Sequence, residues 1–126
     1  MKKVIIADDD FLVRDFLGRA ISRVCGELKI PVEVGAVTSG KELRQKVLEG
    51  TDIYDLVVSD ADMEEVGIGL EILKEVRKWD PQVPYIVISG RSLEIEAKEA
   101  GATAFYQKPF GVNTIEEMMK TYLMAA

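Results

Sequence analysis

The sequence of 126 residues contains no histidine, one cysteine and no long hydrophobic run. Without histidine, the most frequent general base in enzymes, catalysis by an imidazole is excluded. The single cysteine, Cys25, rules out an intramolecular disulfide and favours a reducing compartment. The apolar run at 4–7 is too short for a signal peptide, and no segment reaches the length of a membrane-spanning helix. We therefore expect a cytoplasmic protein without a membrane partner.

Negative charge prevails over positive charge along the chain. There are 22 acidic and 16 basic residues, and the net charge is −6. Such a surface repels phosphates over most of its area, which argues against direct binding of nucleic acid or of an anionic membrane. A phosphate-containing donor can still bind locally where a metal ion and a lysine offset the charge. The length, the 48% apolar content and the 30% charged content are typical of one globular domain, here 1–126.

Short apolar runs alternate with amphipathic segments along the whole chain. The runs have the length and β-branched content of strands buried in a parallel sheet, and they lie at 3–7, 32–37, 56–58, 85–88 and 103–107. Helical periodicity follows each run, at 13–25, 43–48, 70–79, 93–100 and 115–123. This alternation predicts one doubly wound α/β domain with helices on both faces of the sheet.

A few residues mark the ends and faces of these predicted helices. One of the three aspartates at 8–10 is expected to cap the first helix, which Gly26 would end. Thr38 or Ser39 is expected to cap the second. On the third helix, Trp79 is a candidate for the inner face.

Polar side chains follow four of the five predicted strands. They are Asp8 and Asp9, then Asp60, Ser89 and Lys108. Because the carboxyl ends of parallel strands share one edge of the sheet, we expect these groups to converge there. Carboxylates that meet in this way repel one another unless a cation lies among them, and Mg²⁺ is the ion that such oxygen ligands suit.

This set of groups fits the transfer of a phosphoryl group. Phosphoryl transfer depends on positioning and on electrostatic stabilisation of the phosphoryl oxygens more than on proton chemistry. A carboxylate nucleophile is already ionised at neutral pH and needs no general base, which agrees with a chain that has no histidine. Asp60, Ser89 and Lys108 are the candidate reactive residues.

The combination of Asp8-Asp9, Asp60, Ser89 and the segment 108–110, Lys-Pro-Phe, resembles the receiver domain of two-component response regulators. The resemblance covers essentially the whole chain, and within the family it is to the chemotaxis-regulator-like receivers. It implies a flavodoxin-like five-stranded sheet of order 2-1-3-4-5 with five helices and a cis bond before Pro109. The length suggests a stand-alone receiver or one excised from a longer protein.

The resemblance also implies a role for each residue. Asp60 would be the phosphoacceptor, and Asp9 would be the main Mg²⁺ ligand, with Asp8 acting directly or through water. The main-chain carbonyl of Asp62 would complete the metal site. Lys108 would pair with the phosphoryl group.

A switch at the surface of the fourth helix and fifth strand is implied as well. Ser89 would bind a phosphoryl oxygen, and Phe105 falls where the family has an aromatic residue that changes rotamer, although it could equally be a plain strand aromatic. The phosphodonor would be a sensor histidine kinase or a phosphotransfer protein, and the output protein is not identified by the sequence. Such a domain is not an enzyme in the ordinary sense, because it catalyses only its own phosphorylation and dephosphorylation.

Two alternatives belong to other functional classes. A haloacid-dehalogenase-like phosphatase has an Asp-x-Asp nucleophile motif, as at 60–62, but it expects Thr or Val where Glu64 stands and has no use for the acids at 8–9. A pseudo-receiver keeps the fold as an interaction module without phosphorylation. The complete acidic set, together with Ser89 and Lys108, argues against it.

The chain departs from the receiver pattern in two places. Met63 is followed by Glu64 where receivers usually have proline, and the loop 62–69 is about one residue longer than usual. We expect Glu64 and Glu65 to be solvated loop acids. The segment 89–108 is shorter than usual by about one helical turn, so rules for partner binding and dimerisation in the family transfer poorly.

Overall fold

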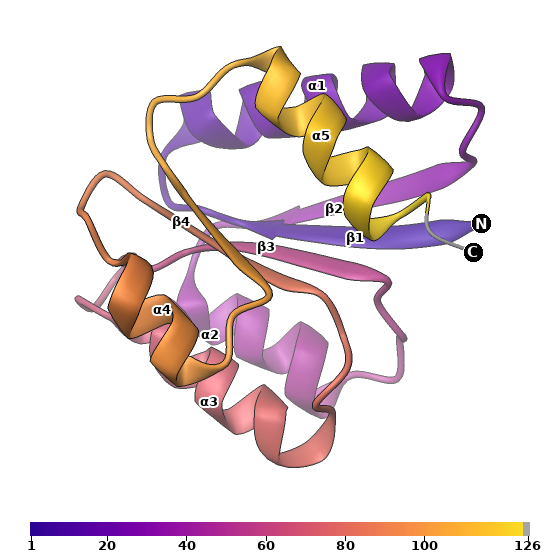
Figure 1. Cartoon of the computed structure of the whole chain (residues 1–126). Helices are drawn as coiled ribbons and strands as arrows, with labels where there is room; N and C mark the ends of the chain where they lie inside the picture. Colours follow the sequence, from indigo (N-terminus) through magenta and orange to yellow (C-terminus); the bar gives the residue numbers. More distant parts are fainter. Residues whose placement is uncertain (125–126) are drawn as a thin grey trace.

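The computed structural model describes residues 1–124, in which five parallel strands form one sheet covered by helices on both faces (Figure 1). The strand order is β2-β1-β3-β4-β5, so the predicted flavodoxin-like α/β fold is confirmed. The strands are β1 (Lys2–Ala7), β2 (Val32–Val37), β3 (Leu56–Asp60), β4 (Tyr85–Ser89) and β5 (Ala104–Gln107). The helices are α1 (Phe11–Glu27), α2 (Gly40–Arg44), α3 (Ile68–Trp79), α4 (Glu94–Ala100) and α5 (Val112–Tyr122), and α2 continues into a π-helical turn, η1 (Gln45–Glu49).

The sheet separates two hydrophobic cores because successive side chains of a strand point to opposite faces. In β1, Val4 and Ile6 pack beneath α1 and α5, whereas Ile5 and Ala7 pack against α2, α3 and α4. Figure 1 shows the same division, with α1 and α5 on one side of the sheet and the other three helices on the opposite side. Both faces are buried, which explains why the strands appear in the sequence as unbroken apolar runs.

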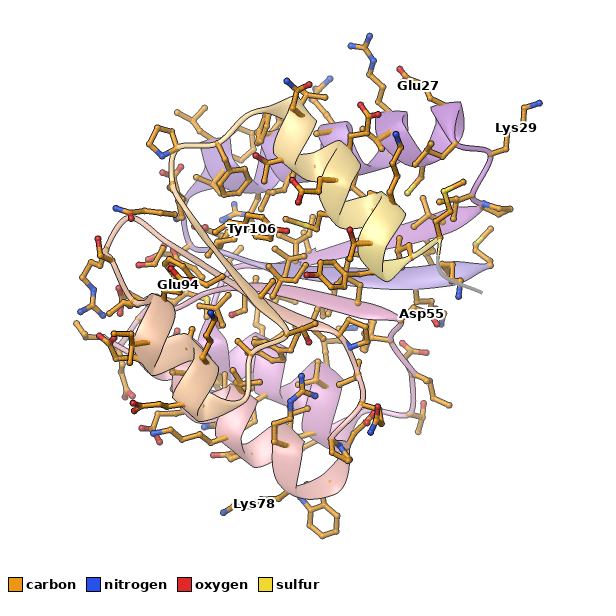
Figure 2. All side chains as sticks on the ribbon, viewed as in Figure 1. Glu27, Lys29, Asp55, Lys78, Glu94 and Tyr106 are labelled. Atoms are coloured by element: carbon orange, nitrogen blue, oxygen red, sulfur yellow. The ribbon has the colours of Figure 1, made fainter. Side chains whose placement is uncertain are left out.

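Charged side chains cover the outer faces of the helices. Figure 2 shows Glu27, Lys78 and Glu94 extending outward from helices on both sides of the sheet. Several ion pairs have i,i+4 spacing, such as Arg19 with Asp15 at 3.0 Å, and exposed pairs of this kind stabilise a helix only slightly. None of the helices within residues 1–124 has the length and apolar character needed to cross a membrane.

The helix ends agree with most of the sequence-based predictions. Asp10 caps α1 by accepting a hydrogen bond from the Leu12 N–H at 2.8 Å. Ser39, one of the two candidates, caps α2 by accepting from the Glu42 N–H at 3.1 Å. The prediction for Trp79 is wrong: its side chain is 85% exposed, because α3 ends at this residue and the chain turns away in extended conformation at Asp80.

Candidate functional site

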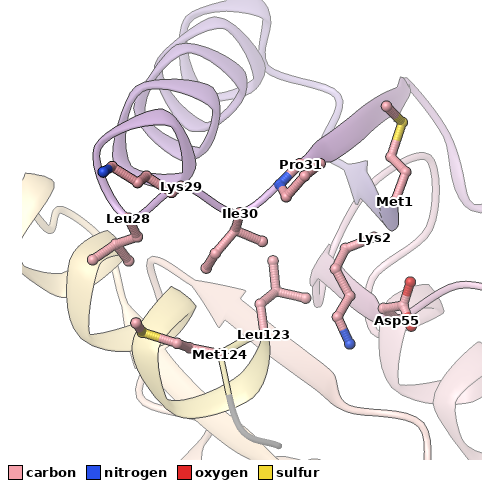
Figure 3. A pocket seen from close by; sticks show the side chains of 9 residues that line it. All are labelled: Met1, Lys2, Leu28, Lys29, Ile30, Pro31, Asp55, Leu123 and Met124. Carbon is pink, nitrogen blue, oxygen red and sulfur yellow. The ribbon is translucent and has the colours of Figure 1, made fainter.

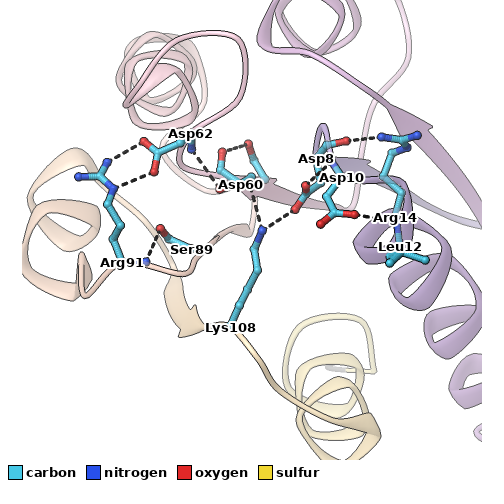
Figure 4. Close-up of polar contacts among 10 residues, drawn as sticks. Asp8, Asp10, Leu12, Arg14, Asp60, Asp62, Ser89, Arg91 and Lys108 are labelled. Atoms are coloured by element: carbon cyan, nitrogen blue, oxygen red, sulfur yellow. Dashed lines mark hydrogen bonds and ion pairs between the residues drawn. The ribbon is translucent and has the colours of Figure 1, made fainter.

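The carboxyl ends of the strands bring four of the predicted groups to one edge of the sheet (Figure 4). Asp8 follows the last residue of β1, Asp60 ends β3 and Ser89 ends β4. The strands are in a register that places Asp60 opposite Ile88 and Ser89 opposite Gln107. Lys108 follows β5 directly, and the peptide bond between Lys108 and Pro109 is cis, as the resemblance implied.

The Lys108 ammonium group lies between two buried carboxylates. Its Nζ atom is 2.9 Å from Asp8 Oδ2 and 2.9 Å from Asp60 Oδ2. Burial raises the pKa of Asp60 above its usual value, although hydrogen bonds from the Asp62 N–H and from Lys108 oppose this shift. Burial alone would lower the pKa of Lys108, but its hydrogen bonds to Asp60 and Asp8 outweigh burial and raise it. The lysine therefore stays charged and favours the ionised form of Asp60.

Asp8, Asp9 and Asp60 form a cluster with the geometry of a candidate cation site. Each offers one carboxylate oxygen, and these oxygens all lie within 4.8 Å of one another. Asp8 and Asp60 are buried, whereas Asp9 is exposed and leaves the cluster open to solvent. Asp8 is held in place because its Oδ1 accepts from the Asp10 N–H at 2.8 Å and its carbonyl accepts from Arg14 Nη1 at 2.8 Å. Oxygen donors of this kind suit Mg²⁺.

An ion pair that the sequence reasoning missed closes one side of the site. The Asp62 carboxylate accepts from Arg91 Nε at 2.8 Å and from Arg91 Nη2 at 2.6 Å, and it also accepts from the Gly67 N–H at 2.7 Å. The hydrogen bond from Arg91 lowers the pKa of Asp62. Arg91 also donates its backbone N–H to Ser89 Oγ at 3.0 Å (Figure 4). The sequence contained one indication of this pair, because Asp62 and Arg91 have opposite charges and each lies two residues beyond the end of one of two neighbouring strands.

The side chain of Asp62 is thus engaged away from the carboxylate cluster. Its main-chain N–H donates to Asp60 Oδ1 at 3.1 Å, which places the start of the loop against the candidate acceptor. The carbonyl that the resemblance assigns to the metal stays a prediction.

Phe105 lies on β5 opposite Val87, half-buried at the margin of the core beneath α2, α3 and α4. Its neighbour Tyr106 points to the opposite face of the sheet and contacts Phe110 in a tilted arrangement of the two rings. This position beside β4 is compatible with a response to Ser89. The switch role of Phe105 itself stays a prediction.

Glu64 and Glu65 are exposed loop residues, as predicted, but the Glu64 carboxylate also binds backbone N–H groups, which was not predicted. Its Oε1 accepts from the Gly40 N–H at 2.6 Å, and its Oε2 accepts from the Lys41 N–H at 2.9 Å. Burial alone would raise the pKa of Glu64, but these two backbone donors lower it. The first N–H groups of a helix lack partners within the helix and attract a carboxylate. The contact between Glu64 and Gly40 joins residues 24 positions apart, so no local sequence pattern predicts it.

An open hollow lies at the opposite edge of the sheet, near the amino ends of β1 and β2 (Figure 3). Lys2, Pro31, Asp55 and Leu123 are among its lining residues. It lacks the convergent carboxylates of the other edge. The strand ends at Asp60, and not this hollow, therefore form the candidate functional site.

Comparison with known proteins identifies the class to which this fold and site belong. The response regulator receiver domain family matches residues 4–120, so the chain belongs to this family. The chemotaxis protein CheY of Thermotoga maritima is 33% identical over 121 residues, which cover 94% of each chain. The chain is therefore a receiver domain of two-component signalling systems, and the phosphatase alternative is not supported.

Two further relatives are a longer regulator and a response regulator of known structure. The KDP operon transcriptional regulatory protein KdpE of Escherichia coli is 31% identical over 127 residues, which are 98% of this chain but 52% of KdpE. The chain thus spans about half the length of that relative. The response regulator TrrA of Thermotoga maritima, solved in complex with Mg²⁺ and BeF, aligns with a TM-score of 0.76 at 25% identity, over 98% of this chain and 100% of TrrA.

Proposed function

We propose that Asp60 accepts a phosphoryl group in a Mg²⁺-dependent reaction and that the chain acts as a single receiver domain. The observation that carries the proposal is the placement of the Asp60 carboxylate at the end of β3, between the Lys108 ammonium group and the cluster with Asp8 and Asp9. The complex of the related TrrA with Mg²⁺ and BeF supports the same chemistry.

The carboxylates of Asp8, Asp9 and Asp60, together with the main-chain carbonyl of Asp62, would hold Mg²⁺. The donor set fits the ion because all four ligands are oxygens and the carboxylate oxygens lie within 4.8 Å of one another. The single ammonium group of Lys108 leaves negative charge in the cluster uncompensated. When bound, Mg²⁺ would neutralise charge on the carboxylates and on the incoming phosphoryl oxygens.

The nucleophile would be a carboxylate oxygen of Asp60. The new bond forms between this oxygen and phosphorus, while the bond from phosphorus to the donor breaks and its electron pair leaves with the donor. The nucleophile is the carboxylate form, so no proton needs to be removed in the step, and the hydrogen bonds from Lys108 and the Asp62 N–H favour this form against the opposing effect of burial. Lys108 and Ser89 would then bind the transferred oxygens and stabilise the acyl phosphate.

Phosphorylation would alter the surface formed by α4 and β5. Ser89 ends β4 and accepts the Arg91 N–H that opens the segment before α4, so its movement toward the phosphoryl group would displace that segment. Phe105 would fill the space that Ser89 leaves. The chain would catalyse only its own phosphorylation and dephosphorylation.

The proposed donor is a sensor histidine kinase or a phosphotransfer protein, acting in the cytoplasm. Phe11 and Leu12, at the start of α1, are exposed apolar residues next to the acidic end of β1. They belong to the surface that a protein donor would have to cover in order to reach Asp60. No nucleic-acid contact is proposed for this acidic domain.

The test is incubation of the protein with Mg²⁺ and acetyl phosphate, followed by intact mass measurement. We expect a gain of one phosphoryl group that hydroxylamine removes, because an acyl phosphate is a mixed anhydride. Asp60→Asn should abolish the gain. Asp9→Ala should weaken Mg²⁺ binding and so raise the Mg²⁺ concentration that the reaction needs. Asp15→Asn is the matched control, since Asp15 lies on α1 and pairs with Arg19. Wild-type protein that neither gains mass nor binds beryllofluoride would indicate a pseudo-receiver.

A further inference from the structure

The loop between β3 and α3 begins and ends against the backbone of the candidate acceptor. The Gly69 N–H donates to the carbonyl of Ala61 at 3.0 Å, and a Cβ atom on Gly69 would overlap the Asp60 carbonyl oxygen. The Tyr85 hydroxyl donates to the Gly69 carbonyl at 3.0 Å and fixes this contact from β4. The base of the loop is therefore held closely against the backbone of Asp60 and Ala61.

The loop is also bonded internally. The Met63 and Ile68 N–H groups both donate to the carbonyl of Glu65 at 3.3 Å, and Gly67 donates to Asp62 Oδ1. Gly67 has a φ of 79°, a left-handed conformation that glycine adopts without steric cost. These bonds link Asp62 to Gly67 and Met63 to Glu65, so they connect Asp62 with the segment that carries Glu64.

Two carboxylates connect this unit to other parts of the molecule. Asp62 binds Arg91, whose backbone N–H binds Ser89. Glu64 binds the first two N–H groups of α2, those of Gly40 and Lys41. These are donors that the helix cap leaves free, because Ser39 Oγ accepts from the N–H of Glu42 instead.

Helix α2 packs closely against the start of α3 and is bonded to α3 again farther along. A Cβ atom on Gly40 would lie 2.5 Å from Ile68 Cγ1. Farther along α2, Arg44 binds Glu75 of α3 through two hydrogen bonds of 3.1 and 3.0 Å. The start of α2 is therefore placed to respond when the Glu64 carboxylate shifts.

We propose that Glu64 is a positioning residue that couples the state of Asp60 to helix α2, so that the first turn of α2 is a second surface that reports phosphorylation. The proposal rests on the phosphoacceptor role of Asp60. A group on Asp60 that draws Ser89 toward it displaces Arg91, and with it Asp62 and the loop. Coupling is reciprocal. If a phosphoryl mimic at the site changes the strength of the contact between Glu64 and α2 by some factor, removal of that contact must change the affinity of the site for the mimic by the same factor.

The test uses NMR of the ¹⁵N-labelled chain, titrated with beryllofluoride in the presence of Mg²⁺. In the wild type we expect the amide signals of Gly40 and Lys41 to shift together with those of Ser89 and Arg91. Glu64→Ala should abolish the response at α2 and weaken beryllofluoride binding by about fivefold, the lower end of typical coupling.

Two control variants isolate the effect of Glu64. Glu65→Ala removes the same charge from the next residue and should preserve both the response and the affinity. Ser39→Ala weakens the cap of the same helix without touching the loop, and it should leave the affinity unchanged.

Three outcomes would overturn the proposal. Shifts at Ser89 and Arg91 without shifts at Gly40 and Lys41 would refute the coupling while leaving the phosphoacceptor role intact. An equal loss of affinity in Ser39→Ala and Glu64→Ala would reduce the role of Glu64 to helix stability. The absence of any binding by the wild type would refute the proposed function and the coupling with it.

Discussion

Replacement of Lys108 by methionine isolates the charge that holds the strand ends together. Methionine retains most of the apolar stem and removes the ammonium group, whose Nζ lies 2.9 Å from both Asp8 Oδ2 and Asp60 Oδ2. Asp8 is fully buried and Asp60 is 6% exposed, so each carboxylate can recover only part of its hydration after the substitution. We expect Lys108→Met to destabilise the metal-free protein.

The magnitude follows from the burial of the partners. Removing one member of a fully buried ion pair costs about 3–5 kcal/mol, because the remaining charge is left without compensation. The Lys108 side chain is 22% exposed, and Asp60 can take up a proton, so we expect a smaller loss of about 2–3 kcal/mol. For a domain of this size, 1 kcal/mol corresponds to roughly 4 °C in Tm, which gives a decrease of about 10 °C.

Thermal unfolding at pH 7 in the presence of a chelator measures this loss. Lys120→Met is the matched control: Lys120 binds Glu116 at 2.8 Å, but both side chains are about half exposed, and the change should stay within about 0.5 kcal/mol. Added Mg²⁺ should raise the Tm of Lys108→Met more than that of the wild type, because a bound cation replaces the missing charge. A Lys108→Met protein as stable as Lys120→Met without metal would refute the reasoning.

Two further predictions concern the surroundings of Asp60. Its raised pKa means that Asp60 in the metal-free native state retains a proton at pH values where the unfolded chain has lost it, so between the ordinary value of 3.8 and the raised value the contribution of Asp60 to stability falls as pH rises. The Tm advantage of Asp60→Asn over the wild type should therefore grow with pH across this range, and a constant difference would contradict the shift. Gly69→Ala should destabilise the fold by about 3 kcal/mol in urea unfolding, because its Cβ would meet the Asp60 carbonyl. Gly18→Ala, at a helical glycine with open space around it, should instead stabilise by about 0.5–1 kcal/mol, and equal effects of the two would contradict the close approach.

The fold was predictable because its determinants are local. The apolar run at 56–58 and the helical stripe on α1 each specify one element, and alternation of such elements leaves few arrangements other than a parallel sheet. Convergence at the site followed from the same topology, since the ends of parallel strands share an edge. The strand order and the cis bond before Pro109 came only from the family resemblance.

The loop contacts were harder to predict because they depend on backbone conformation between elements, and for the pair of Asp62 and Arg91 the sequence offers only their positions beyond neighbouring strand ends. Glu64 reaches the start of α2 only through the path of the loop, and the ion pair between Asp62 and Arg91 requires two loops to approach each other. The prediction for Trp79 was wrong for a different reason. Helical periodicity places this residue on the inner face of α3, but the helix ends there. The π-helical turn η1 after α2 has no distinct sequence signal.

The charge balance of the site explains why Lys108 and a metal ion would have separate roles. With Asp8, Asp9 and Asp60 ionised, three carboxylates face one ammonium group, and the excess equals the charge of one Mg²⁺ ion. Lys108 bridges Asp8 and Asp60, so its charge is divided between them. A cation held by Asp8 and Asp9 would take over the compensation of Asp8. Lys108 would then be available to the oxygens of a phosphoryl group on Asp60, so metal binding would prepare the lysine for the transfer that the site is proposed to perform.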